Sequence, residues 1–164
     1  MARYDASLAE ILVFTFKEGL LGAVAHDLKL KATKFTLEVD GSTARLELDP
    51  ASLRVVTAMK GGVESPSLLS PAKFLDIEDN LTKEVLMVKK FPTIHFNATR
   101  VTDSEVVGQL TLHGQTHEVR GRRSVSTAEF TVDQRQFGIK PFSALLGTLK
   151  VKPEVTVRVK LTAA

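Results

Sequence analysis

The clearest pattern in the chain is VTVRVKLT at residues 155–162, in which apolar and polar residues alternate. Successive side chains of a β-strand point to opposite faces of the sheet, so the alternation predicts a strand with one buried and one solvated face. Antiparallel sheets carry this pattern because one of their faces contacts water. This stretch therefore predicts an antiparallel sheet.

The same alternation recurs upstream, at residues 44–49, 94–98, 106–113 and 128–132. Between Leu28 and Asp40 it changes phase near Thr33 and Lys34, which predicts a β-bulge in a strongly bent strand. Turn sequences separate the stretches, at residues 40–42, 49–50, 103–104 and at Gly114-Gln115. About eight or nine short strands joined by short loops favour a sandwich or a closed barrel.

One segment has a different period. Apolar residues recur every three or four positions between residues 70 and 88, at Phe74, Ile77, Leu81, Val85 and Val88. Pro71 suits a first helical turn, and Lys89-Lys90 followed by Pro92 marks an end. A lone amphipathic helix must bury its apolar side against the sheet, so we expect it to cover an open barrel end.

Composition limits the functional classes. A chain of 164 residues is expected to form a single domain over residues 1–164, and the absence of Cys excludes disulfides and thiolate ligands. No apolar run approaches the roughly 20 residues of a membrane span, so stable membrane insertion is not expected. The start of the chain lacks a signal-peptide pattern, which predicts a cytoplasmic protein, or a periplasmic one if a leader was removed. The net charge is +3, and its one basic cluster, at residues 120–123, lacks interleaved aromatics, so nucleic-acid binding is not expected.

Five residues invite a chemical interpretation. A two-residue turn at Gly114-Gln115 would place His113 and His117 on opposite faces, and a zinc site needs further ligands, so no metal site is expected. His26-Asp27 follows a loop of small residues, and a structural anchor is favoured there over catalysis. Arg123 shares the parity of Val119, so it either pairs at the barrel rim or contacts a ligand.

Three motifs in order resemble the YceI-like family over nearly the whole chain: FPTIHF at 91–96, GQLTLHGQT at 108–116 and QFGI at 136–139. The resemblance implies an all-β fold with one helix, an antiparallel eight-stranded lipocalin-like β-barrel. It also implies transport of a long isoprenoid, such as a polyprenyl lipid or a quinone, without catalysis, cofactor or metal. Several buried isoprene units could supply tight binding, at about 0.8 kcal/mol per CH₂ group.

The resemblance also implies where such a ligand binds. Inward side chains would line the tunnel, the helix and the loop at residues 141–146 would close its ends, and His26 or Arg123 would meet a polar head group. The implied ligand-binding residues are Phe35, Ile77, Leu81, Phe96, Leu110, Leu112, Phe130, Phe142, Val157, His26 and Arg123.

Two other functional classes stay open. In the first, the protein is an enzyme that uses His26-Asp27, or His113 with His117, on a small molecule in the same cavity. In the second, it is an interaction or stress-response module with a solid barrel, whose working surface carries Lys29, Lys31 and Lys34. The sequence is compatible with either a monomer or a homodimer.

Overall fold

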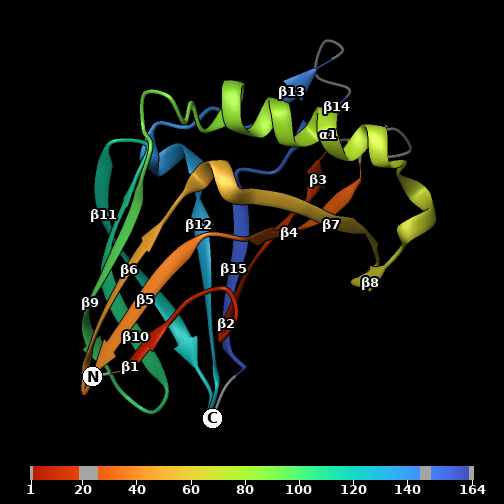
Figure 1. Cartoon of the computed structure of the whole chain (residues 1–164). Coiled ribbons are helices and arrows are strands. Elements are labelled where there is room, and N and C mark those ends of the chain that lie inside the picture. The colour runs from red at the N-terminus through yellow and green to blue at the C-terminus, as the bar shows by residue number, and fades with distance from the viewer. Residues whose placement is uncertain (1, 19–25, 145–148, 163–164) are drawn as a thin grey trace.

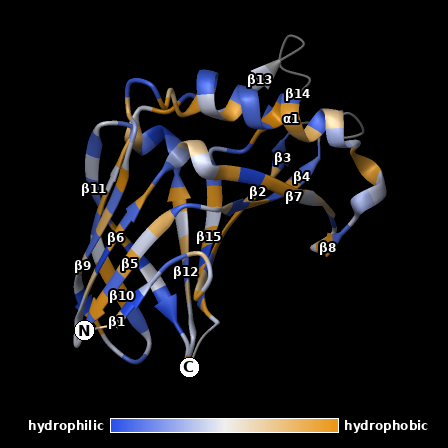
Figure 2. Cartoon of the chain, viewed as in Figure 1, coloured by the Kyte–Doolittle hydropathy of each residue, from blue (hydrophilic) through white to orange (hydrophobic). Residues whose placement is uncertain are grey.

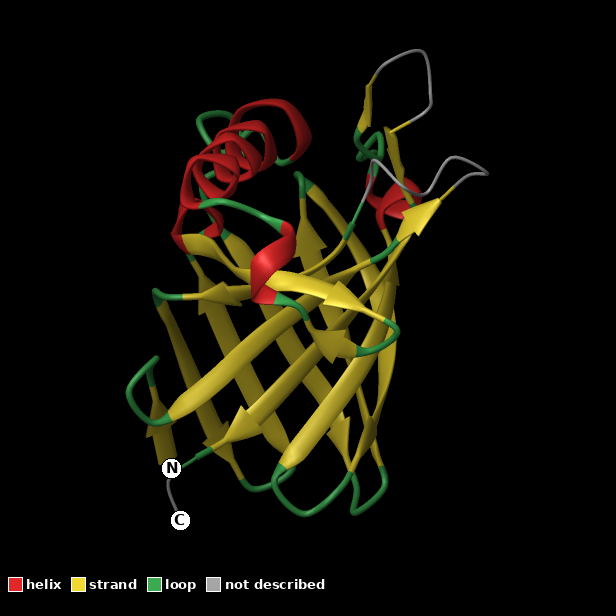
Figure 3. Ribbon diagram, turned by 90° about the vertical axis from the view of Figure 1, so that its right-hand side faces the viewer, coloured by secondary structure: helices red, strands yellow, loops and turns green. Residues whose placement is uncertain are grey.

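The structure is a computed structural model that describes residues 2–18, 26–144 and 149–162. Twelve strands of this part of the chain form one antiparallel sheet, in the order β1-β5-β6-β9-β10-β11-β12-β15-β2-β4-β7-β8 (Figure 1). Three short strands form a second sheet in the order β13-β14-β3. The main sheet curls around a central space (Figure 3).

The strands are β1 (Ala2–Tyr4), β2 (Ala9–Thr15), β3 (Lys17–Glu18), β4 (Asp27–Ala32), β5 (Phe35–Asp40), β6 (Thr43–Leu48), β7 (Leu53–Lys60), β8 (Val63–Glu64), β9 (Ile94–Val101), β10 (Glu105–Leu112), β11 (Gln115–Arg123), β12 (Thr127–Asp133), β13 (Ser143–Ala144), β14 (Leu149–Val151) and β15 (Glu154–Leu161). The helical segments are η1 (Pro50–Ser52), η2 (Pro66–Leu68), α1 (Pro71–Asn80), η3 (Leu81–Val85) and η4 (Gln134–Phe137).

The antiparallel, mostly β architecture with one α-helix is confirmed, but the predicted count of eight strands is wrong. The additional strands include β1, β3, β8, β13 and β14, each with only two or three residues. A run this short shows no period in the sequence, so alternation could not reveal it. Among the described residues, the ladders lead from β1 to β8, and none of them joins these two ends of the sheet.

The predicted change of phase between Leu28 and Asp40 is confirmed. Leu28 and Leu30 face the central space in β4, whereas Leu37 and Val39 face it in β5. The two residues between these strands, Thr33 and Lys34, belong to neither, so the chain breaks here instead of bulging. Because β4 pairs with β2 and β7 while β5 pairs with β1 and β6, this break links the two halves of the sheet.

Hydroxyl and backbone groups of η1 stabilise this link. The Ser52 carbonyl accepts the Thr33 hydroxyl at 2.7 Å, and the Ser52 hydroxyl oxygen accepts the Lys34 N–H at 3.0 Å. A buried backbone donor without a partner would be costly, so these bonds allow the chain to leave one ladder and join another. The bend is therefore fixed by a polar contact that the alternation pattern could not show.

The hairpin between β10 and β11 differs from the prediction by one residue. Leu112 pairs with Gln115, so His113 and Gly114 form the turn, with φ of +54° and +74°. Two positive φ angles are typical of the type I′ turn that suits a two-residue hairpin, and His tolerates this region better than most side chains. The shift leaves His117 opposite Leu110, on the inward face of β11.

The helix begins where predicted and ends earlier. Ser70 caps it by accepting the Lys73 N–H at 3.4 Å, and Pro71 occupies the first turn. After Asn80 the chain widens into a single π-helical turn, η3, and at Met87 the φ angle is +50°. A left-handed residue cannot continue a right-handed helix, which explains why Val88 lies outside it. No helix among the described residues is long and apolar enough to cross a membrane.

The core divides into two clusters. The first contains Ala9, Ile11, Ala32, Phe35, Leu37, Leu48 and Leu53, and the second contains Ala98, Val106, Val119, Phe130, Val132, Phe137 and Ile139. Ala44, Leu86 and Val157 pack against both clusters. These three residues connect the two clusters. Hydrophobic and hydrophilic residues alternate along the strands (Figure 2).

Candidate functional site

A cavity of about 1050 Å³ lies inside the curled sheet. Its middle is lined by apolar side chains of the predicted inward parity, from strands far apart in the sequence: Ile11, Leu30, Leu46, Phe96, Leu110 and Val157. Strand alternation places these side chains on one face, and the curl of the sheet turns that face inward. The hypothesis of a solid barrel is therefore wrong for the centre of the molecule.

Ten of the eleven side chains that the resemblance implied for ligand binding line this cavity: Ile77, Leu81, Phe96, Leu110, Leu112, Phe130, Phe142, Val157, His26 and Arg123. Phe35 does not. It packs into the first core cluster and is 6% exposed. Phe35 opens β5 directly after the break in the bent strand, where its ring fills the joint between the two halves of the sheet.

Two aromatic rings lie over glycines on the cavity wall. A Cβ atom at Gly108 would come within 2.5 Å of Phe96 Cζ, and one at Gly121 within 2.6 Å of Phe130 Cδ2. The two rings contact each other edge to face, with centroids 5.5 Å apart. Because the glycines carry no side chain, the rings lie close to the wall and leave the centre open.

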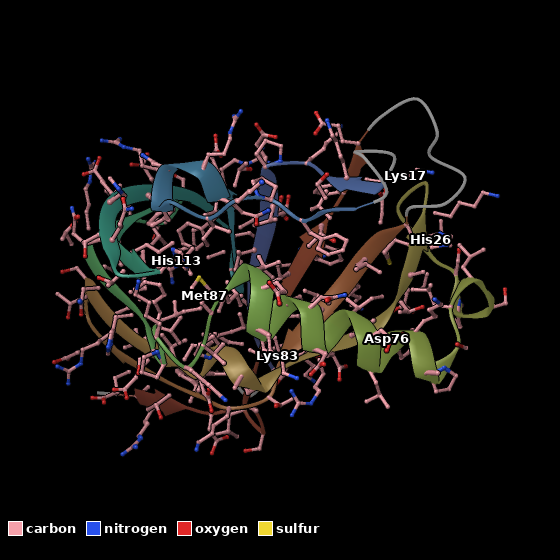
Figure 4. The ribbon with its side chains drawn as sticks, turned by 90° about the horizontal axis from the view of Figure 1, so that it is seen from above. Lys17, His26, Asp76, Lys83, Met87 and His113 are labelled. Carbon is pink, nitrogen blue, oxygen red and sulfur yellow. The ribbon has the colours of Figure 1, made fainter. Side chains whose placement is uncertain are left out.

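Helix α1 covers one end of the cavity (Figures 1 and 4). Lys73, Ile77 and Asn80 line the cavity from one side of the helix, together with Asp76 and Asp79. A Glu78 carboxylate oxygen accepts the backbone N–H of Val55 on β7 at 2.8 Å. The mouth at this end is thus lined by both apolar and charged groups.

The helix and the 141–146 loop are predicted to close the ends of the tunnel, and the described part of this loop lies at the same end as the helix (Figure 1). The second sheet, which begins directly after Phe142, lies at the α1 end (Figure 1). His26 is also at this end, because its neighbour Asp27 binds the backbone of Lys17 in β3 of the second sheet. Residues 145 and 146 of the loop lie outside the described residues. One sequence position could not reveal which end a distant loop would reach.

A positively charged side chain, that of Arg123, lies at the far end of the cavity. Arg123 lines it together with Val125, Ser126 and Thr127. An Arg123 Nη1 donates to the Thr102 carbonyl at 3.0 Å, and among the described residues the guanidinium forms no ion pair. The guanidinium is exposed at the rim, which agrees with the rim placement weighed for it from the sequence. Its basic neighbours differ, since Arg120 pairs with Glu105 at 3.4 Å and Arg122 with Glu129 at 3.9 Å.

The histidines do not form a cluster. The His113 ring stacks on Phe91 at 4.3 Å, and its buried Nε2 has no hydrogen-bond partner among the described residues. The His117 ring packs against Phe137 at 5.1 Å, and its Nε2 lies 3.3 Å from Gln115 Oε1. The described residues contain no group of three potential metal ligands among His, Asp and Glu. These contacts explain both histidines as packing elements at the α1 end.

Asp27 does not orient His26. Its Oδ1 accepts the backbone N–H of Lys17 at 2.7 Å, which attaches β4 to the start of β3. Neighbouring residues of an extended chain point to opposite faces, so the two side chains diverge. His26 lines the cavity, and Asp27 is the structural anchor that the sequence favoured.

Sequence reasoning missed the polar lining of α1 and the two glycines of the wall. Lys73, Asp76 and Asn80 share the helical face of Ile77, and their spacing of three and four residues could have identified them. The helix was analysed only for its apolar side. Gly108 and Gly121 had no such signal, because only the register shows that an aromatic ring covers each of them.

Comparison with known proteins places this architecture. Residues 12–163 match the YceI-like domain. A polyisoprenoid binding domain from Saccharophagus degradans, implicated in plant cell wall breakdown, is a structural neighbour with 7% sequence identity. Its TM-score is 0.51, with 97% of each chain covered. A mutant CJ YCEI protein made for nanotechnology applications is 10% identical, with a TM-score of 0.52 and 82% of each chain covered.

The two structural likenesses concern the fold, because their sequence identities are very low. A comparison with curated proteins finds no match. The family match, by contrast, begins within β2, continues to the end of β15 and includes all three motifs found in the sequence. This chain therefore belongs to the YceI-like domain family.

Proposed function

We propose that this protein binds and transports a long apolar isoprenoid, or a similar amphipathic lipid, in the cavity inside its sheet. The observation that carries the proposal is the cavity itself, about 1050 Å³ in volume, which is lined by residues of both core clusters. A domain of this size gains stability by packing its centre, so an unfilled centre points to a foreign molecule. The proposal includes a closed, lipocalin-like barrel, completed by the link at Thr33 and Lys34.

The chemistry of the lining supports a chain-like apolar ligand. The volume reaches the upper end of the roughly 300–1,000 Å³ that small-molecule sites occupy. Each CH₂ group removed from water contributes about 0.8 kcal/mol, so a chain of several isoprene units gains enough free energy for tight binding. On this proposal no metal, organic cofactor or catalytic side chain takes part.

The polar head group of the ligand would lie at one of the two ends of the cavity, and each end offers a basic side chain. Arg123 supplies a guanidinium at the far end, and His26 supplies an imidazole at the α1 end. Both side chains keep contact with solvent, so the head group can stay partly hydrated while the chain is buried. Replacement of Arg123 and of His26 by Gln, one at a time, decides between the two ends, because only the contacting side chain should alter affinity for a charged lipid.

Organic extraction of the purified protein followed by mass spectrometry tests the proposal. A Leu110→Trp variant should lose the extracted lipid, because Leu110 lines the cavity and the indole would occupy its centre. Gln109→Trp is the matched control, since Gln109 is the adjacent residue of β10 and is exposed. An empty extract from the unmodified protein, together with no uptake of added polyprenyl lipid, would contradict the proposal.

A further inference from the structure

Most of the large exposed apolar side chains belong to one stretch of the sequence, which includes the start of α1. The described residues contain seven large apolar side chains that are clearly exposed, and five of them fall between residues 56 and 87. Leu75 on α1 is 67% exposed, Val63 on β8 is 66% exposed and Leu68 on η2 is 38% exposed. Scattered exposed apolar residues are ordinary, but several in one short segment indicate an interaction surface.

Residues 60–75, here named the mouth segment, read KGGVESPSLLSPAKFL. The segment holds two lysines and a single acid, Glu64, whose carboxylate already pairs with Lys29 Nζ at 3.1 Å. Lys60 and Lys73 are exposed, and neither forms an ion pair with another described residue. The segment therefore presents uncompensated positive charge next to apolar side chains.

The mouth segment is continuous with the cavity. Leu68, Leu69 and Lys73 line the cavity at the α1 end, and Leu68 is also among the exposed apolar side chains. Lys150 on β14 is a further exposed basic residue of the cavity lining. Asp76 and Asp79 are acids on the same lining, and Asp79 pairs with Lys83 at 3.1 Å, so the basic character lies toward the start of α1. Leu68, Leu69 and Lys73 therefore lie where the mouth segment meets the cavity.

Apolar side chains flanked by lysines match the interface of an anionic lipid bilayer. Such surfaces insert Leu and Val at the boundary of head groups and acyl chains, while lysines bind the anionic head groups. We propose that the mouth segment docks this protein on an anionic membrane, with Val63, Leu68 and Leu75 at the acyl boundary. Lys60, Lys73 and Lys150 then contact the head groups. The inference builds on the proposed function, because an apolar ligand in a bilayer could then reach the cavity without crossing water.

Flotation with vesicles tests the docking surface, using pure phosphatidylcholine against equal parts of phosphatidylcholine and phosphatidylserine. We expect binding to the mixed vesicles that falls as salt rises, because salt screens the lysines. The double variant Val63→Ser/Leu75→Ser should weaken binding about tenfold or more, since both side chains lose the acyl boundary. Both residues are largely exposed in the free protein, so the variant should fold normally.

Two controls come from the opposite end. Val125→Ser should leave binding unchanged, although Val125 is 96% exposed, because it lies on the turn between β11 and β12. Lys73→Gln should weaken binding about fivefold, the effect of one charge near an anionic surface. Lys160→Gln, near the end of β15, should not. Circular dichroism of each variant confirms that the fold is intact.

Three results would overturn the proposal. They are equal binding to both kinds of vesicle, the same loss for Val125→Ser as for the mouth-segment variant, and no vesicle binding at all. Sedimentation velocity tests whether the mouth segment binds a second copy of this chain instead of a membrane. A dimer that the Val63→Ser/Leu75→Ser variant dissociates would assign the surface to self-association and would also overturn it.

The extraction experiment keeps this inference distinct from the proposed function. If a lipid is extracted from the cavity but the protein does not bind vesicles, the membrane-docking proposal alone is contradicted. Vesicle binding that depends on the mouth segment, with an empty cavity, would support docking and sink the proposed function.

Discussion

The strands of the wall and helix α1 bury their apolar side chains to very different extents. Ile11 on β2 is 2% exposed and Val132 on β12 is 5% exposed, and both strands have a neighbour on each side. No residue of α1 is buried, and Leu75 points largely into solvent. The wall is therefore fixed by ladders and packing together, whereas the helix is attached by few contacts.

The cover of the cavity, formed by α1 and η3, is packed unevenly against the wall. Leu81 of η3 packs against the first core cluster, Val85 packs against the second, and Leu86 touches both. The first turns of α1 lack such anchors, and the polar attachment to β7 comes from Glu78, in the last turn of the helix. The comparison teaches that α1 should detach from the wall at its beginning first, because regions with few buried contacts have the lowest local stability. This end is also where the mouth segment lies.

The largest expected effect is in the wall. Phe130→Ala should lower the free energy of unfolding by about 3–5 kcal/mol, because the ring is 9% exposed and supports both Phe96 and Gly121. Urea unfolding followed by circular dichroism measures it. Leu75→Ala, on the cover, should change stability by less than about 0.5 kcal/mol. Equal losses in the two variants would break the contrast between wall and cover.

A smaller effect is expected where the wall needs the absence of a side chain. Gly108→Ala should cost about 1–3 kcal/mol, because the new methyl group would lie 2.5 Å from both the Asn97 carbonyl oxygen and the Phe96 ring. The carbonyl belongs to the β9 ladder and cannot yield as a flexible side chain would. Gln109→Ala, at the next residue, serves as the control in the same unfolding experiment. A Gly108→Ala protein as stable as the control would show that the wall adjusts more easily than we infer.

The attachment of the cover comes next. Glu78→Ala should cost about 1–2 kcal/mol, because the Val55 N–H loses a charged acceptor at 2.8 Å. Hydrogen exchange should accelerate in α1 but not in β10 or β11, and release of a bound lipid should be faster. Glu78→Gln should restore part of the protection, since its amide oxygen still accepts a hydrogen bond. Glu84→Ala is the matched control, because Glu84 is exposed and has no hydrogen-bond or ion-pair partner among the described residues. Uniformly unchanged exchange in Glu78→Ala would contradict the role of this contact.

The smallest effect concerns pH at the boundary between wall and cover. Side-chain hydrogen bonds from Arg135, with Nε 3.1 Å from Oδ1, hold the pKa of Asp133 below its usual value. A carboxyl with a lowered folded pKa stabilises the protein above its unfolded pKa, about 3.9, and loses this contribution as pH falls through the folded pKa. The contribution should be less than about 1 kcal/mol, since the side chain is 35% exposed.

Comparison of Asp133→Asn with the unmodified protein isolates this term. The difference in unfolding free energy between the two proteins should be present at pH 7 and should shrink below about pH 4. Asn still caps η4, so the variant removes the charge and keeps the cap. A difference that grows as pH falls would show that the sign is wrong.

Much of the fold could be predicted from particular residues. The alternation at residues 155–162 and 106–112 predicted both the strands and the face that each presents to the cavity. The phase change near Thr33 predicted the bend, although the polar contacts with Ser52 were not visible. The two-residue strands and the exact turn at His113 could not be predicted, because two residues have no period and neighbouring turn registers share one composition.

The candidate site, like the fold, could be predicted from the sequence only in part. Inward parity identified five of the predicted lining residues, because parity depends only on the strand period: Phe96, Leu110, Leu112, Phe130 and Val157. Helical spacing gave Ile77 and Leu81, and the family resemblance gave Phe142, His26 and Arg123. Phe35 was misplaced because parity does not say whether an inward ring meets the cavity or the core. The polar side of α1 and its contact with β7 depend on how the helix is rotated against the sheet. That rotation is set by packing between residues distant in the sequence.

By itself, the sequence determined the strand period, the bent strand, the helix and the family, since each is written in neighbouring residues. Only the tertiary structure decided that the centre holds a cavity, that α1 and the second sheet lie at the same end, and that Arg123 lies at the other end without an ion pair to any described residue. The physical reason is that a cavity is a difference between the volume a sheet encloses and the volume its side chains fill. That difference depends on the curl of the sheet and on how the Phe96 and Phe130 rings lie against the wall, and neither is encoded locally.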